Sequence, residues 1–182
     1  MSSSEKNIKT RKAQAWSACH KLTKIWTSNL PNAKKISVFR ATVESVLLYG
    51  SDAWTLTNRL EKSIDGCYTR MLRMALNVSW KDHKTNEELY GGLPKVSARI
   101  REARLRTAGH CIRHPEEEAS KVVLWQPRRG ISNRGRKHFT YIDNLKKDTG
   151  LEEVRDIEAA MSDSDRWRKD YVKSSRENSR PR

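Results

Sequence analysis

Arginine and lysine are the side chains in this sequence with the clearest chemical potential, because many of them gather in two segments. Residues 96–112 combine them with apolar residues at helical spacing, and Gln126–Lys137 combines them with turn-forming residues. Arginine forks onto phosphate oxygens through parallel hydrogen bonds, which favours contact with a nucleic-acid backbone. The alternative is a solvated cationic face without a specific partner. The candidate nucleic-acid-binding residues are Arg99, Arg101, Arg104, Arg106, Arg128, Arg129, Arg134, Arg136 and Lys137.

Six tryptophans are the next group to weigh, because an exposed indole ring can stack on a nucleobase whereas a buried ring fills a core. We expect Trp16, Trp26 and Trp54 to lie in the core. Trp125 and Trp167 lie beside basic clusters, which makes these two tryptophans candidates for stacking on bases.

Metal binding and catalysis are weakly supported by the remaining residues. His110, Cys111 and His114 are of zinc-ligand types, but a fourth ligand is not evident and the sequence has no Cys-x2-Cys pair. The alternative for His110 is a hydrogen-bonded structural histidine at a helix end. Asp163 and Asp165 have serine neighbours, which favours helix capping over a metal site. We therefore expect no metal, no cofactor and no catalytic residue.

The composition favours nucleic acid as a partner. The 182 residues include 37 Lys and Arg against 22 Asp and Glu, which gives a net charge of +15 and an isoelectric point near 10.0. Such a chain attracts RNA or DNA through the phosphates. A membrane anchor is not expected, because the sequence lacks an apolar run of about 18 residues. The polar N-terminus lacks a signal peptide, so we expect a nuclear or cytoplasmic location.

The elements that must position these residues are expected to be helices. Apolar residues recur every three to four positions, and no segment shows convincing strand alternation. The sequence therefore predicts an all-α fold, an irregular bundle of about six to eight helices with a basic loop and disordered ends. Helices are expected over residues 8–29, 32–48, 60–75, 86–90 and 96–112, with shorter ones after Pro115, near Tyr141, over 151–160 and after Asp163.

Several polar residues are expected to mark where helices begin. Thr85 and Glu88 have the spacing of a capping box, in which each side chain bonds the other residue's backbone amide. Asn32 is a candidate N-cap after Pro31. Glu116–Glu118 are expected to open a short helix, since acidic side chains suit the positive end of the helix dipole.

Several short sequence segments, taken in their order and spacing, resemble those of a known family. These segments are Ala15-Trp16 with Ile25-Trp26, Val46–Leu56, Leu72–Met74, Trp80–Leu89, Gly109–Arg113, Trp125–Arg136 and Asp165–Trp167. Together they resemble the region that follows the polymerase palm in LINE-type (non-LTR) retrotransposon reverse transcriptases. The similarity covers roughly residues 8–172. The family often has a proline and a tryptophan where this chain has Lys137 and Tyr141.

The resemblance implies a parent enzyme that copies RNA into DNA at a nicked target, with palm aspartates that bind metal and an upstream endonuclease domain. This chain has no Tyr-x-Asp-Asp motif, and two-metal chemistry needs converging carboxylates, so we expect no enzymatic activity. The resemblance implies four regions: a disordered N-terminus (1–7), a thumb-like helical region (8–92), a basic helical C-terminal region (93–173) and a disordered tail (174–182).

Two functional hypotheses follow. The first is a non-catalytic module that grips an RNA or DNA backbone through the basic helix and loop, with steep salt dependence and little sequence preference. The second is a protein-interaction module or non-functional remnant of the retrotransposon polyprotein. In that case the apolar stripe of the first two helices is left exposed and mediates self-association.

Overall fold

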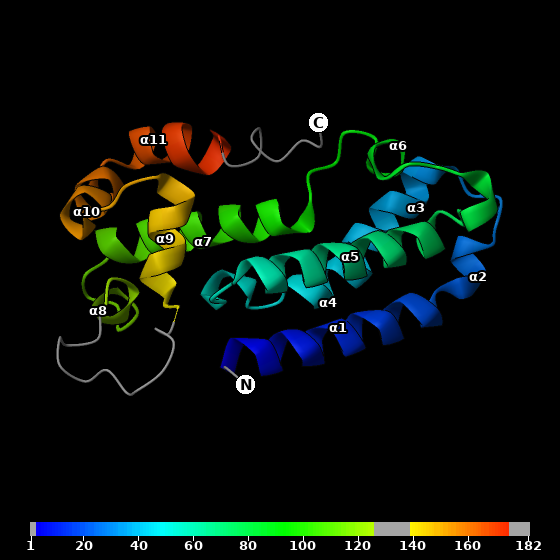
Figure 1. Ribbon diagram of the computed structural model, residues 1–182, viewed down its shortest axis with the longest axis horizontal. Helices are drawn as coiled ribbons and strands as arrows, with labels where there is room; N and C mark the ends of the chain where they lie inside the picture. Colours follow the sequence, from blue (N-terminus) through cyan, green and yellow to red (C-terminus); the bar gives the residue numbers. More distant parts are fainter. Residues whose placement is uncertain (1–2, 126–138, 175–182) are drawn as a thin grey trace. The chain divides into compact units, whose positions relative to one another are not determined.

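The computed structural model describes residues 3–125 and 139–174, and in these ranges the chain forms helices and turns without strands (Figure 1). The all-α prediction is confirmed. The described residues form eleven α-helices, more than expected, because several are single turns. None of these helices is long and apolar enough to cross a membrane.

The chain divides into two compact units. The described part of the N-terminal unit is residues 3–50 and 58–97, and that of the C-terminal unit is residues 51–57, 98–125 and 139–174. The boundary predicted between residues 92 and 93 lies near the division at Ser97. Residues 51–57, which we expected in the first region, fold with the C-terminal unit.

The N-terminal unit is built around two long helices. Its elements are α1 (Ser3–Lys21), α2 (Thr23–Trp26), α3 (Asn32–Phe39), the π-helical η1 (Arg40–Glu44), α4 (Ser45–Leu48), α5 (Asn58–Ala75), the 3-10 turn η3 (Trp80–Asp82) and α6 (Asn86–Tyr90). Helix α1 packs against α4 and α5. The core contains Trp26, Phe39, Leu47, Tyr68 and Leu72, all nearly inaccessible to solvent.

The apolar stripe of the first two predicted helices lies in this core. Cys19, Phe39, Val43 and Leu47 are fully buried, because α1 packs on η1 and α4. The expectation that this stripe is exposed is therefore wrong, and self-association stays a prediction. The isolated sequence shows an amphipathic stripe but not which neighbouring helix covers it.

The predicted helix starts differ in their outcome. Thr85 Oγ1 accepts from the amide of Glu88 at 3.2 Å, and Glu88 Oε2 accepts from the amide of Thr85 at 2.8 Å, so that capping box is confirmed. The N-cap of α3 is Pro31 rather than Asn32. Residues 116–118 form turns and a bend, in which the amide of Glu117 donates to the carbonyl oxygen of His114, and α8 begins only at Ser120, so the helix predicted there is wrong.

The C-terminal unit packs short helices on one long one. Its elements are the 3-10 turn η2 (Ser51–Ala53), α7 (Val96–Arg113, entering from the N-terminal unit), α8 (Ser120–Val123), α9 (Tyr141–Thr149), α10 (Val154–Ser162), α11 (Ser164–Trp167) and the π-helical η4 (Arg168–Lys173). The core contains Leu105, Leu145, Ile157, Met161 and Trp167. The last two elements form one continuous helix, here called α11–η4, because the junction residues keep helical backbone angles.

A glycine allows α11–η4 to approach α7 closely. A Cβ atom at Gly109 would lie 2.6 Å from Nε1 and 2.8 Å from Cδ1 of Trp167. In the space left by the missing side chain, the Trp167 indole donates from Nε1 to the carbonyl oxygen of Leu105 at 2.9 Å. This contact fixes the two helices that bound the site described next.

Residues 51–57 are tied to the C-terminal unit by polar contacts. The amide of Leu56 donates to Asn144 Oδ1 at 3.1 Å, and Thr107 Oγ1 donates to Asp52 Oδ2 at 3.1 Å. Arg104 donates to the carbonyl oxygen of Trp54 at 3.3 Å. These partners lie 50 or more residues apart in sequence, so no local pattern could indicate them.

Candidate nucleic-acid interface

Arg104, which we expected to bind phosphate, is a structural residue. Its side chain is 1% exposed and forms an ion pair with Asp148, whose side chain is also 1% exposed. A second guanidinium nitrogen donates to the carbonyl of Trp54. The prediction for Arg104 is wrong, because a buried and already paired guanidinium cannot reach a backbone phosphate without leaving a buried carboxylate unpaired.

Arg101 and Arg99 are partly withdrawn from the surface. Arg101 Nε lies 3.0 Å from Asp148 Oδ1, and its side chain is 25% exposed. Asp148 thus binds two of the predicted arginines, and it comes from the end of α9, a short helix far along the chain. Arg99 is half-buried on the same helix as Arg101. Little of the predicted α7 cluster is therefore accessible to a ligand.

Arg106 is the predicted α7 arginine with the most exposed side chain, at 67%. It forms an ion pair with Glu102, one helical turn earlier. The Glu102 side chain is only 9% exposed, so the two members of this pair differ in burial. The exposed guanidinium has further N–H groups that can donate to a phosphate while the pair with Glu102 stays formed. Arg106 therefore stays a candidate.

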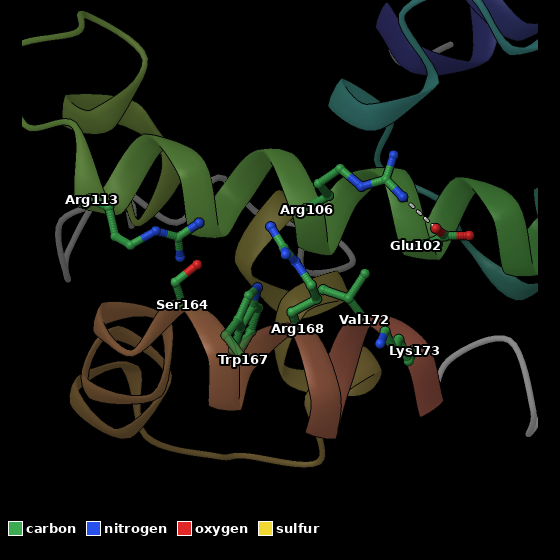
Figure 2. Close-up of a pocket in the computed structure, with 8 residues that line it drawn as sticks. All are labelled: Glu102, Arg106, Arg113, Ser164, Trp167, Arg168, Val172 and Lys173. Atoms are coloured by element: carbon green, nitrogen blue, oxygen red, sulfur yellow. Dashed lines mark hydrogen bonds and ion pairs between the residues drawn. The ribbon is translucent and has the colours of Figure 1, made fainter.

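The structure reveals a cleft beside Arg106 that the sequence had not indicated (Figure 2). Its volume is about 190 Å³, and both of its walls belong to the C-terminal unit. One wall is α7 and the other is α11–η4. The lining residues are Glu102, Arg106, Arg113, Ser164, Trp167, Arg168, Val172 and Lys173.

Each wall contributes two cations to this cleft. Arg106 and Arg113 come from α7, and Arg168 and Lys173 come from η4. Glu102 is the one carboxylate among the described lining residues, and it is already paired with Arg106. The cleft therefore has a strong excess of positive charge.

The π-helical geometry of η4 helps to place its cations on the cleft. In a π-helix the backbone bond runs from i to i+5, so residues four and five positions apart share a face. Arg168, Val172 and Lys173 have this spacing, and all three line the cleft. In Figure 2 the Arg168 side chain extends from α11–η4 toward α7.

The four cations differ in how firmly they are held. Arg113 donates from Nη1 to the carbonyl oxygen of Met161 at 2.8 Å, which fixes the side chain and leaves other N–H groups free to donate. Arg168 and Lys173 are exposed, and neither forms an ion pair with another residue in the described ranges. These two are the most accessible to a ligand.

The two candidate stacking tryptophans differ in position. Trp167 is 2% exposed and its indole nitrogen is hydrogen-bonded, so the prediction that it stacks on bases is wrong. Trp125 is 61% exposed and remains a candidate. The core prediction is confirmed for Trp26 and Trp54, whereas Trp16 is half-buried and stacks on His20 with ring centroids 5.5 Å apart.

The predicted basic loop lies outside the described residues. This applies to Arg128, Arg129, Arg134, Arg136 and Lys137. Their role as phosphate ligands stays a prediction.

The two histidines near the end of α7 pair with glutamates. His110 Nε2 lies 3.4 Å from Glu117 Oε1, and His114 Nδ1 lies 3.1 Å from Glu116 Oε1. Cys111 is buried, and this burial raises the pKa of its thiol. Within the described ranges no group of three or more His, Cys, Asp or Glu is arranged to hold a metal ion.

Capping is the role of Asp163 in the structure. Its Oδ1 accepts from the amides of Asp165 at 3.1 Å and Arg166 at 3.0 Å, which begins α11. Sequence reasoning identified this cap but missed Arg113, Arg168 and Lys173 as site residues. Of these three, only Arg168 and Lys173 could have been suggested by the sequence, because they lie five positions apart in a short basic helix.

Comparison with known proteins adds no relative to this description. No family model matches the chain, and no curated protein or solved structure matches it either. The family resemblance noted in the sequence therefore stays a prediction.

Proposed function

We propose that this chain is a non-catalytic module that binds RNA or DNA through the backbone phosphates, with the cleft between α7 and α11–η4 as a main contact. The observation that carries the proposal is the excess of four cations over one paired carboxylate around this cleft. The net charge of +15 supports it. The resemblance to the C-terminal region of a retrotransposon RNA-directed DNA polymerase is consistent with it.

The proposed contacts differ from those expected from the sequence. Arg101 and Arg104 hold α9 through Asp148, so they position the fold. Arg106, Arg168 and Lys173 are exposed and contact the phosphates, and this interaction carries no sequence information. Each neutralised phosphate releases condensed counterions, so the affinity falls steeply with salt.

The test is binding of the purified chain to a labelled RNA–DNA hybrid and to a single strand, at two salt concentrations and with heparin as competitor. The test variant is the triple substitution Arg106→Gln, Arg168→Gln and Lys173→Gln. We expect it to weaken hybrid binding at low salt and to reduce the slope of log K against log salt by about 0.9 for each phosphate that is no longer neutralised.

A matched control separates the cleft from net charge. Lys121, Arg155 and Lys169 are exposed cations of the same unit that do not line the cleft. Their substitution by glutamine removes the same three charges, and we expect a smaller loss of affinity. Equal losses in the two triple variants, with binding that heparin abolishes at once, would mean that charge alone attracts the nucleic acid.

A further inference from the structure

We infer that the cleft between α7 and α11–η4 binds the terminal phosphate of a nucleic-acid strand. This inference rests on the proposed function and deepens it, because it names the part of the ligand that enters the cleft. The ligand chemistry is a phosphomonoester, and the strand end is its source.

The first argument is the convergence of charge. Phosphates inside a strand follow one another along a line and carry one negative charge each, so a row of cations would match them. Here Arg113 from α7 and Arg168 from η4 line one small cleft from its two walls, and in Figure 2 both side chains extend into the space between the helices, while the Arg106 guanidinium turns along α7 toward Glu102. A terminal phosphate carries a charge of about −1.5 to −2 at neutral pH, which fits converging cations better than a phosphodiester does.

The second argument is that part of the site is already ordered. Arg113 is anchored by the carbonyl oxygen of Met161, and Glu102 holds Arg106. In Figure 2 the Arg113 guanidinium lies near the hydroxyl of Ser164. Guanidinium groups that are held before binding lose less conformational entropy when a phosphate arrives.

The third argument is that the cleft has no exposed aromatic ring face among its described lining residues on which a base could stack. Trp167 lines the cleft but is 2% exposed, so its ring face is covered and a base cannot stack on it. Val172 is also nearly buried. A cleft of about 190 Å³ therefore takes the phosphate and the adjoining sugar, with no dependence on the identity of the terminal base.

The experiment compares oligonucleotides of one sequence that differ only at their ends: a 5′-phosphate, a 3′-phosphate, or hydroxyl groups at both ends. The full chain and single-stranded ligands are used at one fixed salt concentration. We expect one phosphorylated strand to bind about tenfold more tightly than the hydroxyl strand, the effect of about one additional charge-assisted hydrogen bond.

Two variants locate the effect. Arg168→Gln should reduce the preference for the phosphorylated end to about twofold or less, whereas the exposed neighbour Lys169, which does not line the cleft, should leave it intact in Lys169→Gln. Both positions are exposed, and thermal melting checks that both variants fold. Equal loss of the preference in the two variants would overturn the assignment to the cleft.

The binding of the hydroxyl strand keeps this inference separate from the proposed function. Equal affinity for all three strands, with salt-dependent binding retained, overturns the terminal-phosphate inference and leaves the proposed function standing. Failure to bind any strand overturns both. A free nucleoside monophosphate that competes as well as the phosphorylated strand would show that the cleft takes a small phosphate ester, which also overturns the strand-end assignment.

A lower pH gives a second readout. The second pKa of a phosphomonoester is about 6, so near pH 5 its charge approaches that of a diester. The charged groups lining the cleft are Glu102 and the four cations, and the hydroxyl strand measured at each pH controls for effects of pH on the protein. The preference for the phosphorylated strand should fall on acidification, and an undiminished preference contradicts the inference.

Discussion

Two faces of α7 place the same residue type in opposite roles. On one face Arg104 is buried against Asp148, while on the other Arg106 is exposed beside the cleft and pairs with a glutamate of its own helix. The two arginines lie two positions apart, so they point to different neighbours. The comparison teaches that the function of an arginine in a basic helix depends on the residue that another element brings to it.

The largest effect is expected from removing the partner on the buried face. Asp148→Ala leaves Arg104 as an uncompensated buried charge, which should lower the free energy of unfolding by about 3–5 kcal/mol. Chemical denaturation measures this loss. The double variant Asp148→Leu, Arg104→Met should recover most of the stability, and a single variant that loses less than about 1 kcal/mol would contradict the comparison.

The next effect concerns the spacing between α7 and the opposite wall of the cleft. In Gly109→Ala the new methyl group collides with the Trp167 indole, which should cost about 1–3 kcal/mol of stability and weaken binding to phosphorylated strands. Gly66→Ala is the control, because no atom lies within 4 Å of a Cβ at that helical position. It should stabilise the chain by up to about 1 kcal/mol. The melting temperatures of both variants test these two expectations.

The smallest change in stability is expected on the cleft face. Arg106→Gln removes the ion pair with Glu102, whose side chain is only 9% exposed, and should lower the free energy of unfolding by about 1 kcal/mol, less than Asp148→Ala, while it weakens nucleic-acid binding measurably. Chemical denaturation and nucleic-acid binding, both measured on the same preparation, give the change in stability and the change in affinity. A stability loss as large as that of Asp148→Ala would remove the distinction between the two faces.

The fold was predictable where the signal was local. Helical spacing predicted the helices that bury Cys19, Phe39 and Leu72, and the capping box of Thr85 followed from four adjacent residues. The acidic residues 116–118 led to a wrong helix prediction, because the backbone there forms turns in which amides donate to carbonyl oxygens three residues earlier. Local patterns therefore gave the class of the fold and most helices, but not every helix start.

The candidate site was harder to predict, because it depends on contacts between distant segments. Asp148 lies 44 residues from Arg104, and no local pattern joins them. Trp167 lies beside basic residues in sequence, yet the gap at Gly109 lets it enter the core. Arg113 and Arg168 meet at one cleft only because α11–η4 packs against α7. The number of basic residues could be counted from the sequence, but which of them line one cleft could not be predicted from it.

The course of the chain through the two units has a consequence for synthesis on the ribosome. Residues 51–57 emerge before α5, but Asn144, which bonds the amide of Leu56, is made 88 residues later. The C-terminal unit therefore cannot be completed until the growing chain has passed α9. For the same reason, a truncated polypeptide that starts at Ala98 would lack the carbonyl of Trp54 that Arg104 contacts, so a useful expression boundary must lie upstream of Ser51.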